Sequence, residues 1–124
     1  FLSGDERVNK AMAENRKIDF YSARGKDKAD FIEAFVSQYD THPEDMLYIG
    51  DDLFDESIMK LVGHVYCPAD AVLRLKKICG PDNTLQNKGG NNVIAEMVET
   101  LLQRRLMQDP TFEDIESLDK MEVF

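Results

Sequence analysis

Apolar residues along this chain alternate between short runs typical of strands and longer stretches with helical spacing. The short runs predict a strand at the first residues and further strands at 17–21, 46–49, 64–67 and 84–86. Helical spacing predicts helices at 6–15, from the capping residue Asp27 to about Asp40, and at 54–62, 69–78 and 92–107. Strands that alternate with helices in this way pair in parallel through right-handed crossovers. We therefore expect an α/β fold, a Rossmann-like three-layer parallel sheet with helices on both faces.

Length and charge narrow the classes of protein that this chain can represent. Its 124 residues suffice for one domain. No apolar run approaches the roughly 20 residues that cross a bilayer, so we expect no membrane partner. A net charge of −9 repels phosphate backbones, and we expect no nucleic-acid partner. The spacing of Cys67 and Cys79 fits neither a disulfide framework nor zinc, which predicts free thiols in a reducing cytoplasm.

The last residues differ in kind from the rest of the chain. We expect an α/β domain over residues 1–107 and an acidic tail over 108–124, in which one lysine stands against six acidic residues: Asp109, Glu113, Asp114, Glu116, Asp119 and Glu122. Apolar residues in the tail are spaced well enough for a short docking helix. The tail is therefore predicted to be a mobile or partner-docked appendage.

The strongest local pattern is the segment 48–55, Tyr-Ile-Gly-Asp-Asp-Leu-Phe-Asp. It predicts a buried strand whose carboxyl end releases Asp51, Asp52 and Asp55, and ligands bind at that edge of an open α/β sheet. Three crowded carboxylates repel one another unless a cation lies among them, and hard oxygen ligands suit Mg²⁺. A simpler alternative is that Asp51 or Asp52 caps the next helix. A viral polymerase Gly-Asp-Asp turn is excluded by the short chain.

Two further segments carry polar residues to positions where strands are predicted to end. Ser3 and Gly4 offer a hydroxyl and a backbone N–H just before a helix, a natural phosphate site, although a serine there is usually only a cap. Lys26 and Lys28 lie between a strand and a helix, where a lysine can neutralise a transferring phosphoryl group or simply be solvated. The order hydroxyl, lysine, Gly-Asp-Asp-x-x-Asp is more specific than any one member.

With these motifs the sequence resembles the haloacid dehalogenase superfamily of phosphohydrolases. Within it, the chain is similar to the cap-less branch of 3-deoxy-D-manno-octulosonate 8-phosphate (KDO 8-phosphate) phosphatases, a domain also found with acylneuraminate cytidylyltransferases. The resemblance covers about residues 1–103. It rests on Phe-Leu-Ser-Gly at 1–4, Gly-Lys-Asp-Lys-Ala at 25–29, the segment 48–55, Cys-Pro-Ala-Asp-Ala at 67–71 and Lys-Gly-Gly at 88–90.

The resemblance implies roles for the matching residues. Ser3 would bind the phosphoryl oxygens with Gly4, and Lys28 would balance their charge, with Lys26 as the alternative. Asp51 would be the Mg²⁺ ligand, and Asp52 and Asp55 would support the metal's waters and the lysine. Gly89 and Gly90 would lie in a substrate-binding loop that approaches a neighbouring subunit, because members of this branch are typically homotetramers.

One motif of the superfamily has no match in these 124 residues. The Asp-x-Asp that supplies the nucleophile and general acid precedes the serine motif, so we expect it upstream of Phe1, in a longer phosphatase. The resemblance therefore implies that residues 1–107 are the carboxyl-terminal part of the domain and lack its N-terminal strand or strands. In addition, Phe54 replaces a usual Asn, and Asn91 and Asn92 replace a usual charged residue and Gly.

Three functions remain open from the sequence. The first is a Mg²⁺-dependent phosphomonoesterase acting on a phosphorylated octulosonate or nonulosonate, with its nucleophile upstream. The second is a non-catalytic domain that tetramerises a fused or partnered cytidylyltransferase. A weaker third is a phosphoacceptor domain read by Lys28, but such domains assemble acids from several loops and here one loop supplies them.

Overall fold

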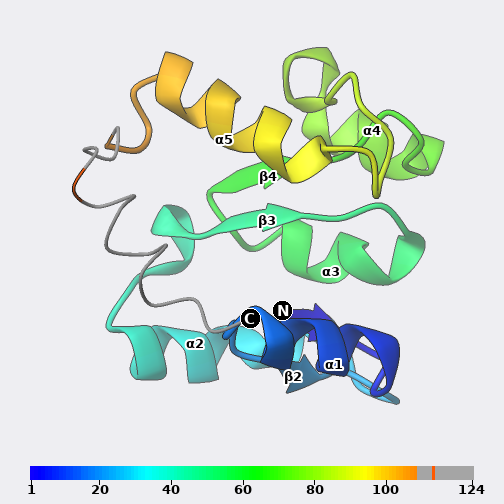
Figure 1. Cartoon of the computed structure of the whole chain (residues 1–124), viewed down its shortest axis with the longest axis vertical. Coiled ribbons are helices and arrows are strands. Elements are labelled where there is room, and N and C mark those ends of the chain that lie inside the picture. The colour runs from blue at the N-terminus through cyan, green and yellow to red at the C-terminus, as the bar shows by residue number, and fades with distance from the viewer. Residues whose placement is uncertain (109–112, 114–124) are drawn as a thin grey trace.

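The computed structural model of this chain describes residues 1–108 and 113. Strands and helices alternate along the chain (Figure 1). The elements are β1 (Leu2–Ser3), α1 (Val8–Asn15), β2 (Tyr21–Ser22), a 3₁₀ helix (Lys28–Phe31), α2 (Ile32–Tyr39), a 3₁₀ helix (Pro43–Asp45), β3 (Leu47–Ile49), a 3₁₀ helix (Leu53–Asp55), α3 (Glu56–Met59), β4 (His64–Tyr66), α4 (Leu73–Cys79), a 3₁₀ helix (Pro81–Asn83) and α5 (Val93–Gln103).

The strands form two separate parallel pairs. β1 pairs with β2, with Leu2 opposite Tyr21, and β3 pairs with β4, with Leu47 opposite His64. Parallel pairing is therefore confirmed. The sequence predicted one sheet, but among the described residues no strand pairing joins the two pairs. Beyond β4 there is a single parallel bridge between Cys67 and Thr84.

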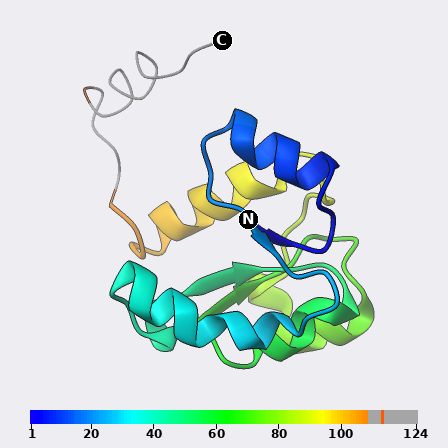
Figure 2. The same ribbon diagram turned by 90° about the horizontal axis from the view of Figure 1, so that it is seen from below.

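Helices cover both faces of the strands, as predicted (Figure 2). On one face, Ile32 of α2, Ile58 and Met59 of α3 and Leu75 of α4 form a buried cluster that packs against Tyr48 and other partly buried residues. On the other face, Val93 of α5 packs with Tyr66 and Leu85, and Leu47 and Ile49 lie against this second cluster. Successive side chains of β3 point to opposite faces, which is why both clusters share this strand.

Several predicted boundaries were wrong. The helix predicted at 69–78 begins only at Leu73, because a turn closes first, with the Ala71 N–H donating to the Pro68 carbonyl at 3.1 Å. The strand predicted at 84–86 is reduced to the bridge at Thr84. The strand predicted at 17–21 is shifted to Tyr21–Ser22.

The carboxyl-terminal expectations fall largely beyond what the structure describes. The docking helix predicted in the tail lies outside the described residues.

Among the described residues, no helix combines the length and apolar character that crossing a bilayer requires.

Candidate active site

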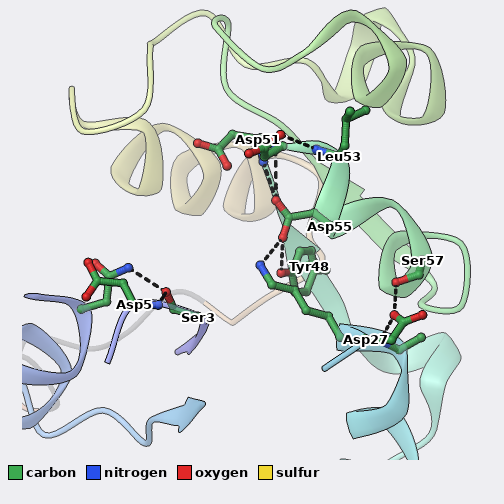
Figure 3. Close-up of polar contacts among 12 residues, drawn as sticks. Ser3, Asp5, Asp27, Tyr48, Asp51, Leu53, Asp55 and Ser57 are labelled. Atoms are coloured by element: carbon green, nitrogen blue, oxygen red, sulfur yellow. Dashed lines mark hydrogen bonds and ion pairs between the residues drawn. The ribbon is translucent and has the colours of Figure 1, made fainter. Parts of the chain in front are cut away.

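The polar turn after β3 is built around Asp55. This carboxylate is 4% exposed, although it belongs to a loop rich in polar residues. Its Oδ1 accepts hydrogen bonds from Lys28 Nζ and from the Tyr48 hydroxyl, both at 2.6 Å. Its Oδ2 accepts from the backbone N–H groups of Asp51 at 3.0 Å and Asp52 at 3.1 Å (Figure 3). Asp55 therefore ties the 3₁₀ segment that bears Lys28 to the end of β3.

The hydrogen bonds made by Asp55 determine the charge states of Asp55 and Tyr48. Burial alone would raise the pKa of Asp55, but hydrogen bonds from Lys28, Tyr48 and the backbone of Asp52 outweigh burial and hold that pKa below its usual value. Burial and the Asp55 carboxylate together raise the pKa of the Tyr48 hydroxyl. At neutral pH the site therefore contains an ionised Asp55 that accepts from a lysine ammonium and a neutral phenol.

The position of Lys28 is set by Asp27. The Asp27 carboxylate caps the short helix of Lys28, accepting from the Ala29 N–H at 3.0 Å, and also accepts from the Ser57 hydroxyl of α3. The hydrogen bond from Ser57, followed by that from the Ala29 N–H, lowers the pKa of Asp27. The capping role predicted for Asp27 is confirmed, and its bond to Ser57 anchors the lysine loop to α3 (Figure 3).

Asp52 and Asp51 have different surroundings although they are adjacent. The Asp52 carboxylate accepts from the Leu53 N–H at 2.6 Å and forms a reciprocal capping box with Asp55. The capping alternative raised for this turn therefore holds for Asp52, and its role as a metal ligand stays a prediction. Asp51 is exposed, and partial burial together with the charges of Asp55 and Asp52 raises the pKa of its carboxyl group.

A metal ion would relieve the repulsion at Asp51. Within residues 1–108 and 113, no group of three or more His, Cys, Asp or Glu side chains is arranged to hold a metal. The donor set therefore fits a cation that binds through one or two carboxylates and keeps water or phosphate oxygens as its other ligands, which is how Mg²⁺ is usually held. It does not fit a closed, all-protein metal site.

Ser3 is buried at the end of β1. Its hydroxyl oxygen accepts from the Asp5 N–H at 3.0 Å and from Asn9 Nδ2 at 2.8 Å. The capping of α1 is done instead by Asp5, which accepts from the N–H groups of Arg7 and Val8 at 2.9 and 3.0 Å. Because Ser3 only accepts in these contacts, its hydroxyl proton remains available for an anionic ligand.

The tertiary structure brings most of the predicted residues together. A cavity of about 300 Å³ is lined by residues from β1, β3 and the loops around them, among them Ser3, Lys28, Asp51, Asp55 and Gly89. The Gly89 N–H donates to Asp70 Oδ1 at 2.8 Å, which holds the Gly-Gly loop at this cavity. Residues from four separate sequence segments therefore meet at the carboxyl ends of β1 and β3.

Other predicted residues lie beside this cavity. Gly4 and Lys26 line a neighbouring cavity of about 940 Å³, which Lys28 also borders. Lys26 Nζ lies 5.8 Å from the centre of the Phe31 ring. Gly90 follows Gly89 with a φ of 77°. The sequence left open whether Lys28 or Lys26 balances the charge of the phosphoryl group. Lys28 is the lysine that pairs with Asp55.

Sequence reasoning assigned no role to Tyr48 or to Gly50. Tyr48 donates to Asp55, and its position in the buried strand gave no sign that its hydroxyl would meet a carboxylate seven residues later. Gly50 is buried against the Asp55 side chain, and a Cβ at this position would lie 2.6 Å from Asp55 Cβ. The sequence placed Gly50 at the end of a predicted buried strand, but only the packing shows why glycine is needed.

The substitution Gly50→Ala is expected to lower the free energy of unfolding by about 1–3 kcal/mol, because the added methyl group must displace the Asp55 side chain. Urea unfolding followed by circular dichroism measures this loss. Gly89→Ala is the matched control, since its Cβ would meet nothing closer than Asp70 Oδ1 at 3.6 Å. Equal losses in the two variants would contradict the predicted clash.

Comparison with known proteins identifies the class. The haloacid dehalogenase-like hydrolases match residues 6–97 of this chain. The chain therefore belongs to the haloacid dehalogenase-like hydrolase family, and the resemblance seen in its motifs is confirmed.

Solved structures with a similar fold include phosphatases of one branch. The cobalt-bound deoxy-D-mannose-octulosonate 8-phosphate phosphatase from Haemophilus influenzae is 25% identical, with a TM-score of 0.77 over 97% of this chain and 69% of that one. The 3-deoxy-D-manno-octulosonate 8-phosphate phosphatase from Yersinia pestis is 26% identical, with a TM-score of 0.69 over 78% of this chain and 51% of that one. The chain thus spans between about half and two thirds of these structures.

Proposed function

We propose that the polypeptide to which this chain belongs is a Mg²⁺-dependent phosphomonoesterase that hydrolyses a phosphorylated sugar acid. The observation that carries the proposal is the Lys28–Asp55 pair, which borders one cavity with Ser3 and Asp51 in a chain of this hydrolase family. A partly buried ammonium and a hydroxyl that border the same cavity are suited to a phosphoryl group, because both donate to its oxygens.

Each residue has a separate task in the proposed reaction. The Ser3 hydroxyl donates to one phosphoryl oxygen, and the Lys28 ammonium balances the charge of another. Asp55 and Tyr48 do not touch the phosphoryl group but hold Lys28 and the turn in place. An aspartate upstream of Phe1 would attack the phosphorus, the P–O bond to the sugar would break, and water would hydrolyse the resulting aspartyl-phosphate.

Asp51 would hold the Mg²⁺ ion, with Asp52 close by on the same turn. Bound there, Mg²⁺ would supply positive charge to the phosphoryl oxygens. The raised pKa of Asp51 supports this assignment, because a carboxylate crowded by Asp55 and Asp52 gains most from a neighbouring cation.

The proposed substrate is a KDO 8-phosphate or a nonulosonate 9-phosphate. The names of the similar phosphatases from H. influenzae and Y. pestis support this class. Gly4, Lys26, Gly89 and Gly90 would contact the sugar acid, the first two from the larger neighbouring cavity. We further propose a cytoplasmic homotetramer, in which the Gly-Gly loop closes a neighbouring subunit's site against water.

A second candidate function is a non-catalytic domain that assembles a sugar-acid cytidylyltransferase. One observation supports it: Phe54 and Leu53 are 79% and 55% exposed beside the site, as interface residues would be in an isolated chain.

Phosphate release from KDO 8-phosphate by the full-length protein tests the proposal. With Asp51→Asn, the Mg²⁺ concentration for half-maximal activity is expected to rise by about 10- to 100-fold, because one charged ligand is lost. Asp45→Asn, which removes an exposed acid from the 3₁₀ helix Pro43–Asp45, is expected to leave that concentration unchanged. A folded, full-length protein that releases no phosphate with or without Mg²⁺ would favour the assembly domain instead.

A further inference from the structure

The larger cavity beside the candidate active site has a positive border. It has a volume of about 940 Å³, and its charged side chains are four basic and two acidic ones: Arg24, Lys26, Lys28, Lys60, Asp27 and Glu56. The whole chain, in contrast, carries a net charge of −9. A positive cleft in a negative protein concentrates anions at that one place. Because Lys28 also borders the cavity of Ser3 and Asp51, an anion in the larger cavity would lie next to the phosphoryl site.

Three of the four basic side chains at this cavity already have a partner. Lys28 and Lys60 are each held in an ion pair, with an N–O distance of 2.6 Å in both cases. Lys26 Nζ lies 5.8 Å from the centre of the Phe31 ring, which is within the range of a cation–π contact. Within residues 1–108 and 113, the exposed Arg24 side chain makes no hydrogen bond, ion pair or ring contact. Arg24 is therefore the basic residue that can take up an anion without breaking a contact.

The two acids at the same cavity are bound elsewhere and do not pair with Arg24. The Asp27 carboxylate accepts from the Ser57 hydroxyl, a contact that Figure 3 shows, and from a backbone N–H of its own loop. Glu56 is held between Lys60 and Arg74. The hydrogen bonds from Arg74 and Lys60 hold the pKa of Glu56 below its usual value, so this carboxylate stays ionised and paired.

A tight turn places Arg24 beside the serine motif. The turn of residues 23–26 is closed by a hydrogen bond of 3.0 Å between its ends, and Gly25 has a φ of 69°. Arg24 therefore occupies the first central position of the turn, and the glycine supplies the left-handed conformation that follows. The first residue of the turn donates its N–H to the Ser3 carbonyl at 2.9 Å, and a Cβ at Gly4 would lie 3.9 Å from the Cα of Arg24. The backbone of Arg24 is thus fixed next to the proposed phosphoryl site.

The proposed substrate needs a second anion site at a distance from its phosphoryl group. An octulosonate 8-phosphate carries its carboxylate on the first carbon and its phosphate on the last, so the two charges lie at opposite ends of the sugar. The cavity of Ser3 and Lys28 has a volume of about 300 Å³, at the lower limit for a ligand pocket. With the phosphoryl group in that cavity, the sugar and its carboxylate would extend into the larger cavity bordered by Arg24.

We propose that Arg24 binds the carboxylate of the sugar acid and makes the protein selective for phosphorylated sugar acids over neutral sugar phosphates. This inference rests on the proposed function, because the phosphoryl site fixes the other end of the ligand. A guanidinium group matches a carboxylate with two parallel N–H···O hydrogen bonds, whereas a lysine ammonium offers only a point charge. Arg24 would contact the substrate far from the phosphorus and take no part in breaking the P–O bond.

Isothermal titration calorimetry on the full-length protein tests the proposal. The ligand is KDO 8-phosphate in a buffer with EDTA, so that binding is measured without Mg²⁺-dependent turnover. Arg24→Gln is expected to raise the Kd for KDO 8-phosphate by about 5- to 30-fold, because one charge-assisted contact to the carboxylate is lost. Ribose 5-phosphate, which has no carboxylate, is the control ligand, and its Kd should change by less than about twofold.

Two further variants separate the contact from the charge. Lys60→Gln removes the same charge from the border of the same cavity, but Lys60 is paired with Glu56. It is expected to change the Kd of either ligand by less than about twofold. Arg24→Lys keeps the charge and loses the second parallel hydrogen bond, so it should recover only part of the lost affinity for KDO 8-phosphate.

Two results would overturn the proposal. One is a rise in the Kd for KDO 8-phosphate that is no larger in Arg24→Gln than in Lys60→Gln. The other is a wild-type Kd for KDO 8-phosphate that is no lower than the Kd for ribose 5-phosphate.

Failure of this inference can be told apart from failure of the proposed function, because the calorimetry does not depend on catalysis. A protein that binds KDO 8-phosphate through Arg24 but releases no phosphate would contradict the phosphatase activity and keep the carboxylate site. A protein that releases phosphate and binds equally well after Arg24→Gln would contradict the carboxylate site alone.

Discussion

Replacing Asp55 with alanine is expected to lower the free energy of unfolding by about 3–5 kcal/mol. The Lys28 and Asp55 side chains are 16% and 6% exposed, so the substitution leaves a largely buried ammonium without its counter-ion. It also leaves the Tyr48 hydroxyl and the N–H groups of Asp51 and Asp52 without an acceptor. Urea unfolding of the wild-type chain and the variant measures the loss.

Asp52→Ala is the matched control for this experiment. It removes an acid of equal charge from the same turn, but Asp52 is exposed and only caps a short helix, so we expect a loss of about 1 kcal/mol. The double variant Asp55→Leu with Lys28→Met should recover part of the stability, because no charge is left buried. A loss for Asp55→Ala no larger than that for Asp52→Ala would contradict the buried-pair interpretation.

The stability supplied by Asp55 should also depend on pH. Its pKa is lower in the folded state than in the unfolded state, so the contribution is complete above the unfolded value of about 3.9. This contribution to the free energy of unfolding is lost as the pH falls through the pKa that Asp55 has in the folded state. The difference in stability between the wild-type chain and Asp55→Ala should therefore shrink in acid.

In the full-length protein, Lys28→Met is expected to lower kcat for phosphate release by about 10²–10³-fold, the usual cost of losing one preorganised donor to a transition-state charge. The ammonium of Lys28 is held by Asp55 at 2.6 Å and borders the cavity of Ser3 and Asp51. Methionine keeps most of the length of the side chain and removes the ammonium, with its charge and its hydrogen-bond donors. Steady-state kinetics with KDO 8-phosphate separates the effect on kcat from that on KM.

Lys26→Met distinguishes the two lysines that the sequence left open. Lys26 is exposed and lies near the Phe31 ring in the neighbouring cavity, so its loss is expected to change KM and leave kcat nearly intact. The opposite outcome, with kcat lost in Lys26→Met and retained in Lys28→Met, would transfer the phosphoryl-binding role to Lys26. A normal kcat in both variants would show that neither lysine takes part in the proposed reaction.

Local physical chemistry explains which parts of the fold could be predicted. The apolar run before Gly50 and the helical spacing after Asp27 and Asn92 depend on neighbouring residues only, and the corresponding elements β3, α2 and α5 are present. The weaker strand at 84–86 depends on pairing with Cys67, which lies far away in the sequence, and the start of α4 depends on the turn that closes between Pro68 and Ala71. These boundaries were wrong.

The sequence by itself determined the parallel α/β class, the strand-end positions of Ser3, Lys28 and the Asp51–Asp55 turn, and the family, because motifs and periodicity are local properties of the chain. Only the tertiary structure decided which role each of the carboxylates of Asp51, Asp52 and Asp55 has. Burial and four hydrogen bonds make Asp55 a structural partner of Lys28, a backbone N–H draws Asp52 into capping, and Asp51 is left facing the cavity. Adjacent residues of one chemical type acquire different roles when they differ in burial and partners, and those depend on contacts between segments far apart in the chain.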